Sequence, residues 1–197
     1  MITYDALIFD CDGTLADTMP VHYRAWSLAA EKFGLDFPED RFYALGGVPV
    51  HKIVEMLIDE AGVVASVEEV VEFKEANYLR CLEVVVPVEP VLAIARAHRG
   101  RLPMAVASGS TRAMVQRTLR QIGVLDWFEC LVAAEDTLRH KPDPDVFLEA
   151  ARLLQVAPDR CCVYEDTDTG ITAARRAGMA HVDIREFHTP KRQTRPS

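Results

Sequence analysis

Apolar residues in this chain gather in five short runs that are typical of buried β-strands. The runs cover residues 6–10, 104–108, 130–134, 161–165 and 181–184. Between the last four runs, apolar positions recur at helical spacing in patterns that begin at Ser110, at Asp143 and at about Asp168. At the second of these, we expect Asp143 as N-cap and Pro144 as the first helical residue. Alternating strands and helices predict an α/β fold, a doubly wound parallel sheet with helices on both faces.

The segment between the first two strands is much longer than a crossover needs. One helix, roughly Val88 to His98, is enough to join two parallel strands. The surplus predicts four helices. The first is capped by Thr18 and ends at Gly34, and a short second helix follows Pro38. The third runs from about Pro49 to Ala61, and the fourth opens with a capping box at Ser66. We therefore expect an inserted helical cap, residues 16–85, on a core domain of residues 1–15 and 86–197. The polar tail 186–197 is expected to be flexible.

Two carboxylates follow the first strand directly. Residues i and i+2 of a strand share a face, so Asp10 and Asp12 should project together, and Gly13 allows the chain to turn. Close carboxylates repel each other and shift each other's pKa, a cost that is met where a cation binds or one carboxyl holds a proton. Taken alone, the pair would fit an ordinary strand exit with solvated acids.

Two further segments follow other strands. Ser108-Gly109-Ser110 offers a hydroxyl, backbone N–H groups and a helix N-terminus, which suits an anion, although a plain helix cap has the same pattern. Lys141 precedes a helix that starts with proline. It is either a solvated surface charge or a cation that reaches the acids.

A fourth segment carries acids beyond an apolar strand, as at Asp10. Glu165 and Asp166 occupy this position. Asp166 together with Asp10 would form an oxygen-rich site suited to Mg²⁺. The alternative is the usual enrichment of acids at a helix N-terminus, which explains Asp168 better than it explains these two residues.

Charge and cysteine content narrow the class of protein. The net charge of −8 argues against nucleic acid and anionic membranes as partners. Five cysteines without zinc-like spacing suggest reduced thiols and a cytoplasmic location. We expect no signal peptide, because the first apolar run is only four residues long, and no membrane span.

The predicted cap holds a cation on an apolar helix face. Lys74 shares the inward stripe of the fourth cap helix with Val70 and Tyr78. Such a cation either snorkels to solvent at the edge of the cap or meets an anionic or polar ligand. His22, one turn from Trp26 on the first cap helix, is a second candidate for ligand contact.

In order and placement, the four segments resemble the haloacid dehalogenase-type phosphohydrolase superfamily. The resemblance covers residues 5 to about 185, and the inserted cap is similar to that of the β-phosphoglucomutase-like subgroup. Asp17-Thr18, His22 and Ala25-Trp26 follow the pattern of that subgroup. The stretch from Ser108 to Met179 looks most like small bacterial sugar-phosphate phosphatases of the fructose-1-phosphate type.

The resemblance implies roles for the acidic residues. Asp10 would be the nucleophile that forms an aspartyl-phosphate, and Asp12 would be the general acid and base. Mg²⁺ would be held by Asp10, Asp166 and the backbone carbonyl of Asp12. Glu165 would orient metal-bound water.

The same resemblance implies the residues that contact substrate. Ser108, Gly109 and Lys141 would bind the phosphate, while Lys74 and His22 would meet the distal part of the substrate. The hypothesis is a Mg²⁺-dependent phosphatase of a small sugar phosphate, expected to be a monomer.

Two alternatives stay open at this point. A sugar-phosphate mutase of the same subgroup would carry an arginine on the cap loop, where this chain has Val50. A non-catalytic sugar-phosphate-binding protein would have lost an acidic residue or Lys141. A true dehalogenase has no need of Asp12 as an acid.

Overall fold

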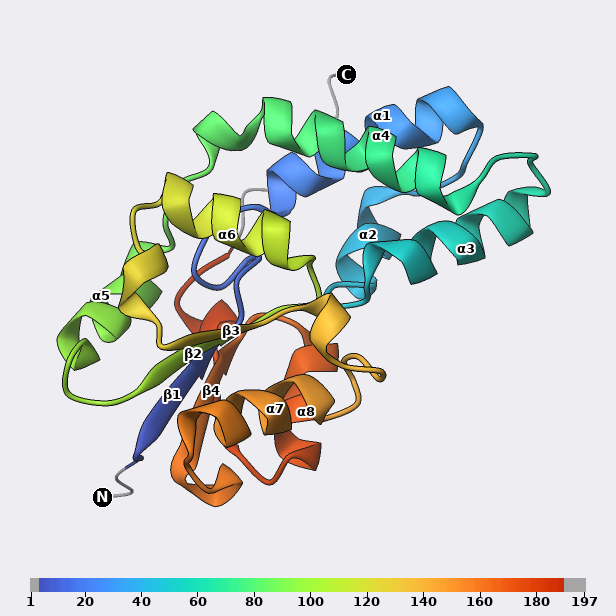
Figure 1. Cartoon of the computed structure of the whole chain (residues 1–197). Coiled ribbons are helices and arrows are strands. Elements are labelled where there is room, and N and C mark those ends of the chain that lie inside the picture. Colours follow the sequence, from blue (N-terminus) through green and yellow to red (C-terminus); the bar gives the residue numbers. More distant parts are fainter. Residues whose placement is uncertain (1–3, 190–197) are drawn as a thin grey trace.

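The computed structural model describes residues 4–189 and contains a five-stranded parallel sheet flanked by helices (Figure 1). The strands are β1 (Ala6–Phe9), β2 (Met104–Ala107), β3 (Cys130–Val132), β4 (Cys161–Glu165) and β5 (Ala180–Asp183). Their order in the sheet is β3-β2-β1-β4-β5, and every neighbouring pair is parallel. The predicted α/β architecture is confirmed. Because β1 lies between β2 and β4, the carboxyl ends of these three strands meet.

Side chains of the central strand alternate between two apolar layers. Ala6 and Ile8 pack with α7 and α8, whereas Leu7 and Phe9 pack with α5 and α6. The helices are α5 (Glu89–His98), α6 (Arg112–Gln121), α7 (Asp145–Leu154) and α8 (Asp168–Arg176). Burial on both faces explains why the strands are continuously apolar.

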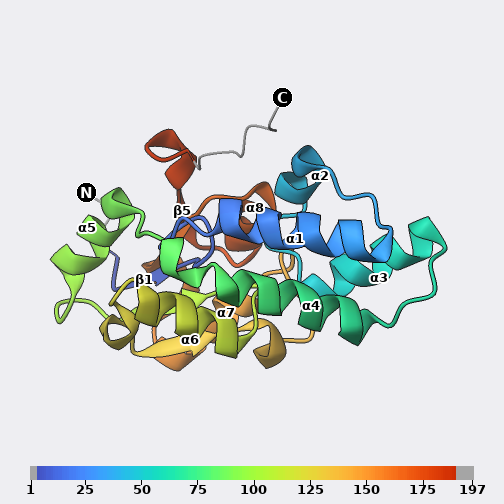
Figure 2. The same cartoon turned by 90° about the horizontal axis from the view of Figure 1, so that it is seen from above.

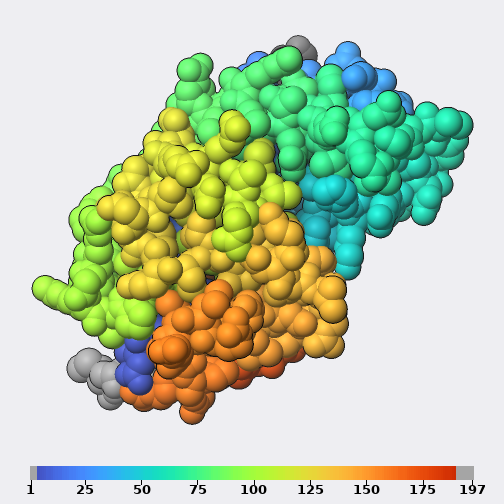
Figure 3. All heavy atoms as spheres, in the orientation of Figure 1, coloured from blue at the N-terminus to red at the C-terminus, as the bar shows by residue number. Residues whose placement is uncertain are grey.

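Four helices between β1 and α5 form the helical cap. They are α1 (Met19–Phe33), α2 (Glu39–Ala44), α3 (Val50–Ala61) and α4 (Val67–Arg80). Trp26, Leu57 and Val70 belong to an apolar cluster inside the cap. α1 and α4 lie side by side (Figure 2), and the cap forms a lobe across one end of the core (Figure 3).

The two chain segments that join cap and core are hydrogen-bonded to each other. Asp17 N–H donates to Val86 O at 2.9 Å, and Val88 N–H donates to Leu15 O at 3.0 Å. The two connections therefore run together as a narrow bridge. The division into a cap of residues 16–85 and a separate core domain stays a prediction.

Two helix starts differ from the prediction. The helix expected from Ser110 begins at Arg112, because Thr111 is an extended N-cap and Ser110 lies in a bend. There the Ser110 N–H donates to the Ser108 hydroxyl, and its carbonyl accepts from the Ala134 N–H. Pro144, expected as the first helical residue, is itself the N-cap of α7. Asp143, expected at that position, belongs to a turn in which its N–H donates to the carbonyl of His140.

Four strands also differ slightly. β1 and β2 each end one residue before the expected residues 10 and 108. β3 ends at Val132 rather than at residue 134, since Ala134 begins a short 3-10 turn. β5 lies one residue earlier than expected, because Ile184 starts another such turn. That turn contains the first residue of the predicted flexible tail, and residues 190–197 of the tail lie outside the described residues. Within residues 4–189, no helix is long and apolar enough to cross a membrane.

Candidate active site

The carboxyl ends of β1 and β4 place two acids around one buried lysine. Lys141 Nζ donates to Asp10 Oδ1 at 2.6 Å and to Glu165 Oε2 at 2.7 Å. It also donates to the Ala107 carbonyl at 3.3 Å, which engages all three of its N–H groups. Lys141 is only 3% exposed, so it is not a solvated surface charge.

The pKa values inside this cluster depend on burial and on the pairing of Lys141 with the carboxylates. Burial opposes the charge on Lys141, but the carboxylates of Asp10 and Glu165 outweigh it and raise the lysine's pKa. Burial raises the pKa of Asp10, and the attraction of Lys141 offsets only part of that effect. Burial, followed by repulsion from Glu165, raises the pKa of Asp166 to about 8. The site is therefore short of positive charge.

Three buried carboxylates could hold a metal ion here. Oxygen atoms of Asp10, Glu165 and Asp166 lie within 4.8 Å of one another. If all three are ionised, Lys141 leaves two negative charges uncompensated, and a divalent cation would balance them. The donors are oxygens only, which fits Mg²⁺.

Glu165 is already engaged by the protein. Its Oε1 accepts from the N–H of Asp166 at 3.0 Å and from the N–H and hydroxyl of Thr167 at 2.9 and 2.8 Å, while Oε2 accepts from Lys141. Asp166 accepts a single side-chain hydrogen bond, from the Thr14 hydroxyl at 2.9 Å. Asp10 and Asp166 therefore have more free oxygen lone pairs for a ligand than Glu165 has.

Gly13 is required for the position of Asp166. Its φ is +91°, and a Cβ at this position would lie 2.3 Å from Asp166 Oδ2. Any side chain would displace the carboxylate and strain the turn. The glycine after Asp12 thus serves both the turn and the acidic cluster.

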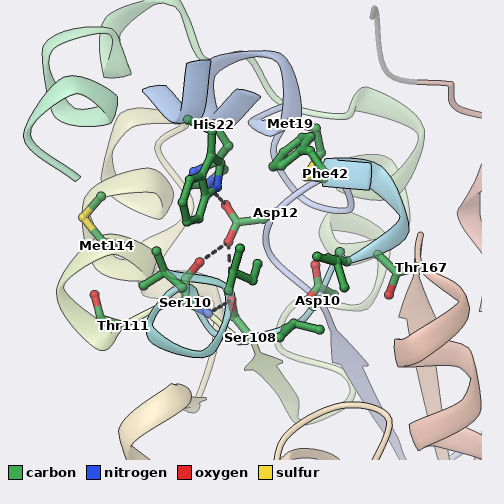
Figure 4. Close-up of a pocket in the computed structure, with 18 of the residues that line it drawn as sticks. Asp10, Asp12, Met19, His22, Phe42, Ser108, Ser110, Thr111, Met114 and Thr167 are labelled. Atoms are coloured by element: carbon green, nitrogen blue, oxygen red, sulfur yellow. Dashed lines mark hydrogen bonds and ion pairs between the residues drawn. The ribbon is translucent and has the colours of Figure 1, made fainter. Parts of the chain in front are cut away.

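Asp12 points toward the cap rather than into the acidic cluster (Figure 4). It accepts hydrogen bonds from the hydroxyls of Ser110 at 2.7 Å and Thr18 at 2.9 Å, and it lies 3.1 Å from His22 Nε2. Burial opposes ionisation of Asp12, but the attraction of His22 and these hydrogen bonds prevail, holding its pKa below the usual range. The chain stabilises this group as a carboxylate.

His22 connects Asp12 to the lysine of the cap. Lys74 Nζ lies 3.0 Å from His22 Nδ1, and the imidazole stacks on the ring of Tyr78 with centroids 4.0 Å apart. Burial and the charge of Lys74 lower the pKa of His22. A neutral imidazole fits, with Nε2–H donating to Asp12 and Nδ1 accepting from Lys74. Lys74 is 5% exposed, which rules out snorkelling, and burial lowers its pKa to about 8.

A pocket lies between these groups and the cap. Asp10, Asp12 and Ser108 line it on the core side. Its cap side is largely apolar and includes Met19, Trp26, Phe42, Leu45, Val48, Val50 and Ile53. The cap loop touches the core at the pocket edge, where the Thr169 hydroxyl donates to the Gly46 carbonyl at 2.5 Å.

Gly109 lets the cap loop approach closely. A Cβ on this residue would lie 2.6 Å from the Gly47 carbonyl oxygen. Ser108 beside it is 1% exposed, and its hydroxyl lies 3.4 Å from Asp12. The expected pair is therefore at the pocket floor, and phosphate contact by either residue stays a prediction.

Sequence reasoning missed several hydroxyl residues. Ser110 and Thr18 belong to segments that the sequence singled out, but neither was predicted to contact Asp12, and both donate a hydrogen bond to it. Thr14 and Thr167, which hold Asp166 and Glu165, were not singled out. Their positions in the sequence could have identified them, because each hydroxyl lies within or directly after an acidic or anion-binding motif.

The sequence matches the model of one protein family, described as haloacid dehalogenase-like hydrolases, over residues 4–178. The chain belongs to this family. The chain is accordingly a haloacid dehalogenase-like hydrolase, and the predicted resemblance is confirmed.

Similar family members include phosphatases and a mutase. Fructose-1-phosphate phosphatase YqaB of Escherichia coli (strain K12) is 38% identical over 183 residues, which are 92% of this chain and 97% of that protein. β-Phosphoglucomutase of Bacillus subtilis (strain 168) is 30% identical, with 91% and 82% covered. The crystal structure of β-phosphoglucomutase from Clostridium difficile superimposes with a TM-score of 0.80 at 26% identity, covering 92% of this chain and 84% of that one.

Proposed function

We propose that this enzyme hydrolyses a small sugar phosphate through an aspartyl-phosphate formed on Asp10. The observation that carries the proposal is that two carboxylates in different surroundings line one pocket, with Asp10 in the Lys141–Glu165 cluster and Asp12 held from the cap. Relatives named as phosphatases of fructose 1-phosphate and of phosphorylated carbohydrates support the substrate class.

The first step replaces the sugar on phosphorus by Asp10. Lys141 engages Asp10 Oδ1, which leaves the other carboxylate oxygen as the attacking atom. An O–P bond to Asp10 forms as the P–O bond to the sugar breaks. A carboxylate approaching a phosphate dianion is repelled, and Lys141, the Ser108 hydroxyl and the N–H groups near Gly109 offset that repulsion.

Asp12 handles the proton in both steps. A bound phosphate dianion adds negative charge beside Asp12 and raises its pKa, so protonation of Asp12 accompanies substrate binding. That proton passes to the leaving sugar oxygen. The resulting carboxylate then takes a proton from the water that attacks the phosphorus, releasing inorganic phosphate and regenerating Asp10.

Mg²⁺ fits the same residues. Asp10 and Asp166, with the backbone carbonyl of Asp12, are the groups that would hold the ion, which supplies positive charge to the phosphoryl oxygens when bound. Glu165 keeps Lys141 in place, and Thr14 orients Asp166.

A mutase must bind a second phosphate, and the pocket lining does not favour one. Val50, at the start of α3, lines the cap side where an arginine would be needed. Among the described residues that line this pocket, Lys74 is the lysine and none is an arginine. The likeness to a β-phosphoglucomutase therefore supports shared aspartyl chemistry rather than transfer to a second sugar position.

The proposal is tested by phosphate release from a panel of sugar phosphates and p-nitrophenyl phosphate, with Mg²⁺ and with EDTA. We expect Mg²⁺-dependent hydrolysis, and no isomerised sugar phosphate among the products. Turnover in excess EDTA would refute the metal site. Isomerised product dependent on a sugar bisphosphate would instead establish the mutase.

A further inference from the structure

Glu75 lies on the cap side of the candidate active site and takes no part in the proposed proton transfer or metal binding. It follows Lys74 in α4, is partly buried, and lines the same pocket as Asp10 and Asp12. The other cap residues of that lining are mostly apolar. A carboxylate there is exceptional in its surroundings and faces any part of a ligand that extends from the phosphate toward the cap.

The neighbouring lysine does not neutralise this carboxylate by direct contact. Lys74 Nζ is turned toward His22, at 3.0 Å, and lies 5.6 Å from the centre of the Trp26 ring. Within residues 4–189, Glu75 makes no hydrogen bond or ion pair. Its acceptor oxygens are therefore available to a ligand, while the cation beside it is engaged inside the cap.

We propose that Glu75 determines specificity for the distal part of the substrate, accepting hydrogen bonds from sugar hydroxyls and repelling a second anionic group. The inference rests on the proposed phosphatase function and narrows its substrates to monophosphates of sugars that carry no other charged group. Phosphorylated sugar acids and sugar bisphosphates are the excluded class.

The physical reason has an attractive and a repulsive part. A hydroxyl that donates to a carboxylate forms a charge-assisted hydrogen bond, stronger than one between neutral groups. A distal carboxylate or phosphate would instead place like charges together in a poorly solvated, apolar pocket, where repulsion is weakly screened. Lys74, the lysine of this lining, is directed to His22, and Val50 supplies no further cation. The pocket therefore discriminates by penalising the wrong ligand.

The test compares Glu75→Gln with wild type on three substrates. Fructose 1-phosphate represents a neutral distal end, 6-phosphogluconate carries a distal carboxylate, and p-nitrophenyl phosphate lacks both features. We expect the preference for fructose 1-phosphate over 6-phosphogluconate, as a ratio of kcat/KM, to fall at least about tenfold in Glu75→Gln. The change should come mainly from KM, and p-nitrophenyl phosphate should be unaffected.

Glu72→Gln is the matched control, because Glu72 is exposed on the same helix and does not line the pocket. It should leave all three substrates at wild-type values. An unchanged preference in Glu75→Gln, or an equal change in Glu72→Gln, would overturn the proposal.

A binding measurement separates this proposal from the proposed function. The dissociation constants of both sugar phosphates are measured with the Asp10→Asn protein and with Asp10→Asn/Glu75→Gln. Tighter binding of 6-phosphogluconate in the double variant supports the role of Glu75 even if no substrate is turned over. Equal binding refutes it even if the wild type is an active phosphatase.

Discussion

Lys141 opposes the protonation of Asp10, the nucleophile that we propose, inside a buried site. Burial by itself favours the protonated, unreactive form of Asp10, and the 2.6 Å contact with Lys141 opposes that effect. Glu165 holds the lysine from the other side at 2.7 Å. Removing Lys141 would leave both carboxylates without compensation, a change that is strongly destabilising.

Replacing Asp10 by asparagine should abolish turnover without unfolding the protein. The amide is isosteric, its oxygen can still accept from Lys141, and it cannot form a stable aspartyl-phosphate. We expect kcat to fall by a factor on the order of 10³ or more, with binding of sugar phosphate retained in calorimetry. Asp59→Asn, on the exposed face of α3, is the control. More than a tenth of wild-type turnover in Asp10→Asn would rule out the covalent step.

At the scale of elements, one loop of the cap and the start of α8 determine how the pocket closes. Thr167 and Thr169, at that helix start, lie within 3.2 Å of each other, and Thr169 reaches the Gly46 carbonyl. Gly47 rests against Gly109 at the end of β2. These contacts hold the cap loop on the core, directly above the acidic cluster.

Replacing Thr169 by valine should loosen this loop. Valine keeps the shape of the side chain but removes the donor to Gly46, at a cost of about 1 kcal/mol in the free energy of unfolding. We expect KM for a sugar phosphate to rise severalfold and proteolysis near Gly46 to become faster. Thr137→Val is the matched control, because the Thr137 hydroxyl has no hydrogen-bond partner among the described residues. Equal effects of the two substitutions would show that the contact between Thr169 and Gly46 is not what holds the loop.

At the scale of the molecule, the site exists only where cap and core meet. Each part has its own apolar cluster, and a smaller cluster that includes Tyr78 of the cap and Met114 of the core lies between them. Asp10 and Asp166 come from the core, while His22, Lys74 and Glu75 come from the cap. Opening the cap would therefore separate the side of the pocket that we propose for the phosphate from the side that we propose for the sugar.

The stability of the whole chain should depend on pH and Mg²⁺ through Asp166. Its pKa is about 8 in the folded protein against 3.8 as the unperturbed value, so between these limits the folded state binds the extra proton. The free energy of unfolding therefore falls as pH rises across this window, by about 2 kcal/mol from pH 6 to 8. Because Mg²⁺ at the proposed site would bind the ionised carboxylate, the stabilisation it gives should grow over the same range.

Thermal unfolding in EDTA and in millimolar Mg²⁺ at pH 6 and 8 checks this expectation. Asp166→Asn, which cannot ionise, is the reference from which other titrating groups are subtracted. The wild-type melting temperature should fall several degrees more than that of the variant between pH 6 and 8 in EDTA. Identical pH dependence of the two proteins would contradict the raised pKa.

The sequence by itself determined the fold class and the identity of the acidic residues. Short apolar runs separated by helical patterns have few arrangements other than a parallel sheet, and the carboxyl ends of its strands must meet at one edge. Asp10, Glu165 and Asp166 were predicted for that reason, whereas the role of Lys141 came only from the family resemblance. Local signals also gave the capping box at Ser66, which the structure confirms.

Only the tertiary structure decided how these groups are paired and what the cap contributes. The direction of Asp12 toward His22, the inward turn of Lys74 and the unpartnered position of Glu75 depend on side chains far apart in the sequence. The boundaries near Ser110 and Pro144 shifted because backbone hydrogen bonds outside the helices competed for the same residues. Both kinds of contact depend on tertiary packing, of cap on core or of loops within the core, for which hydrophobic periodicity carries no information.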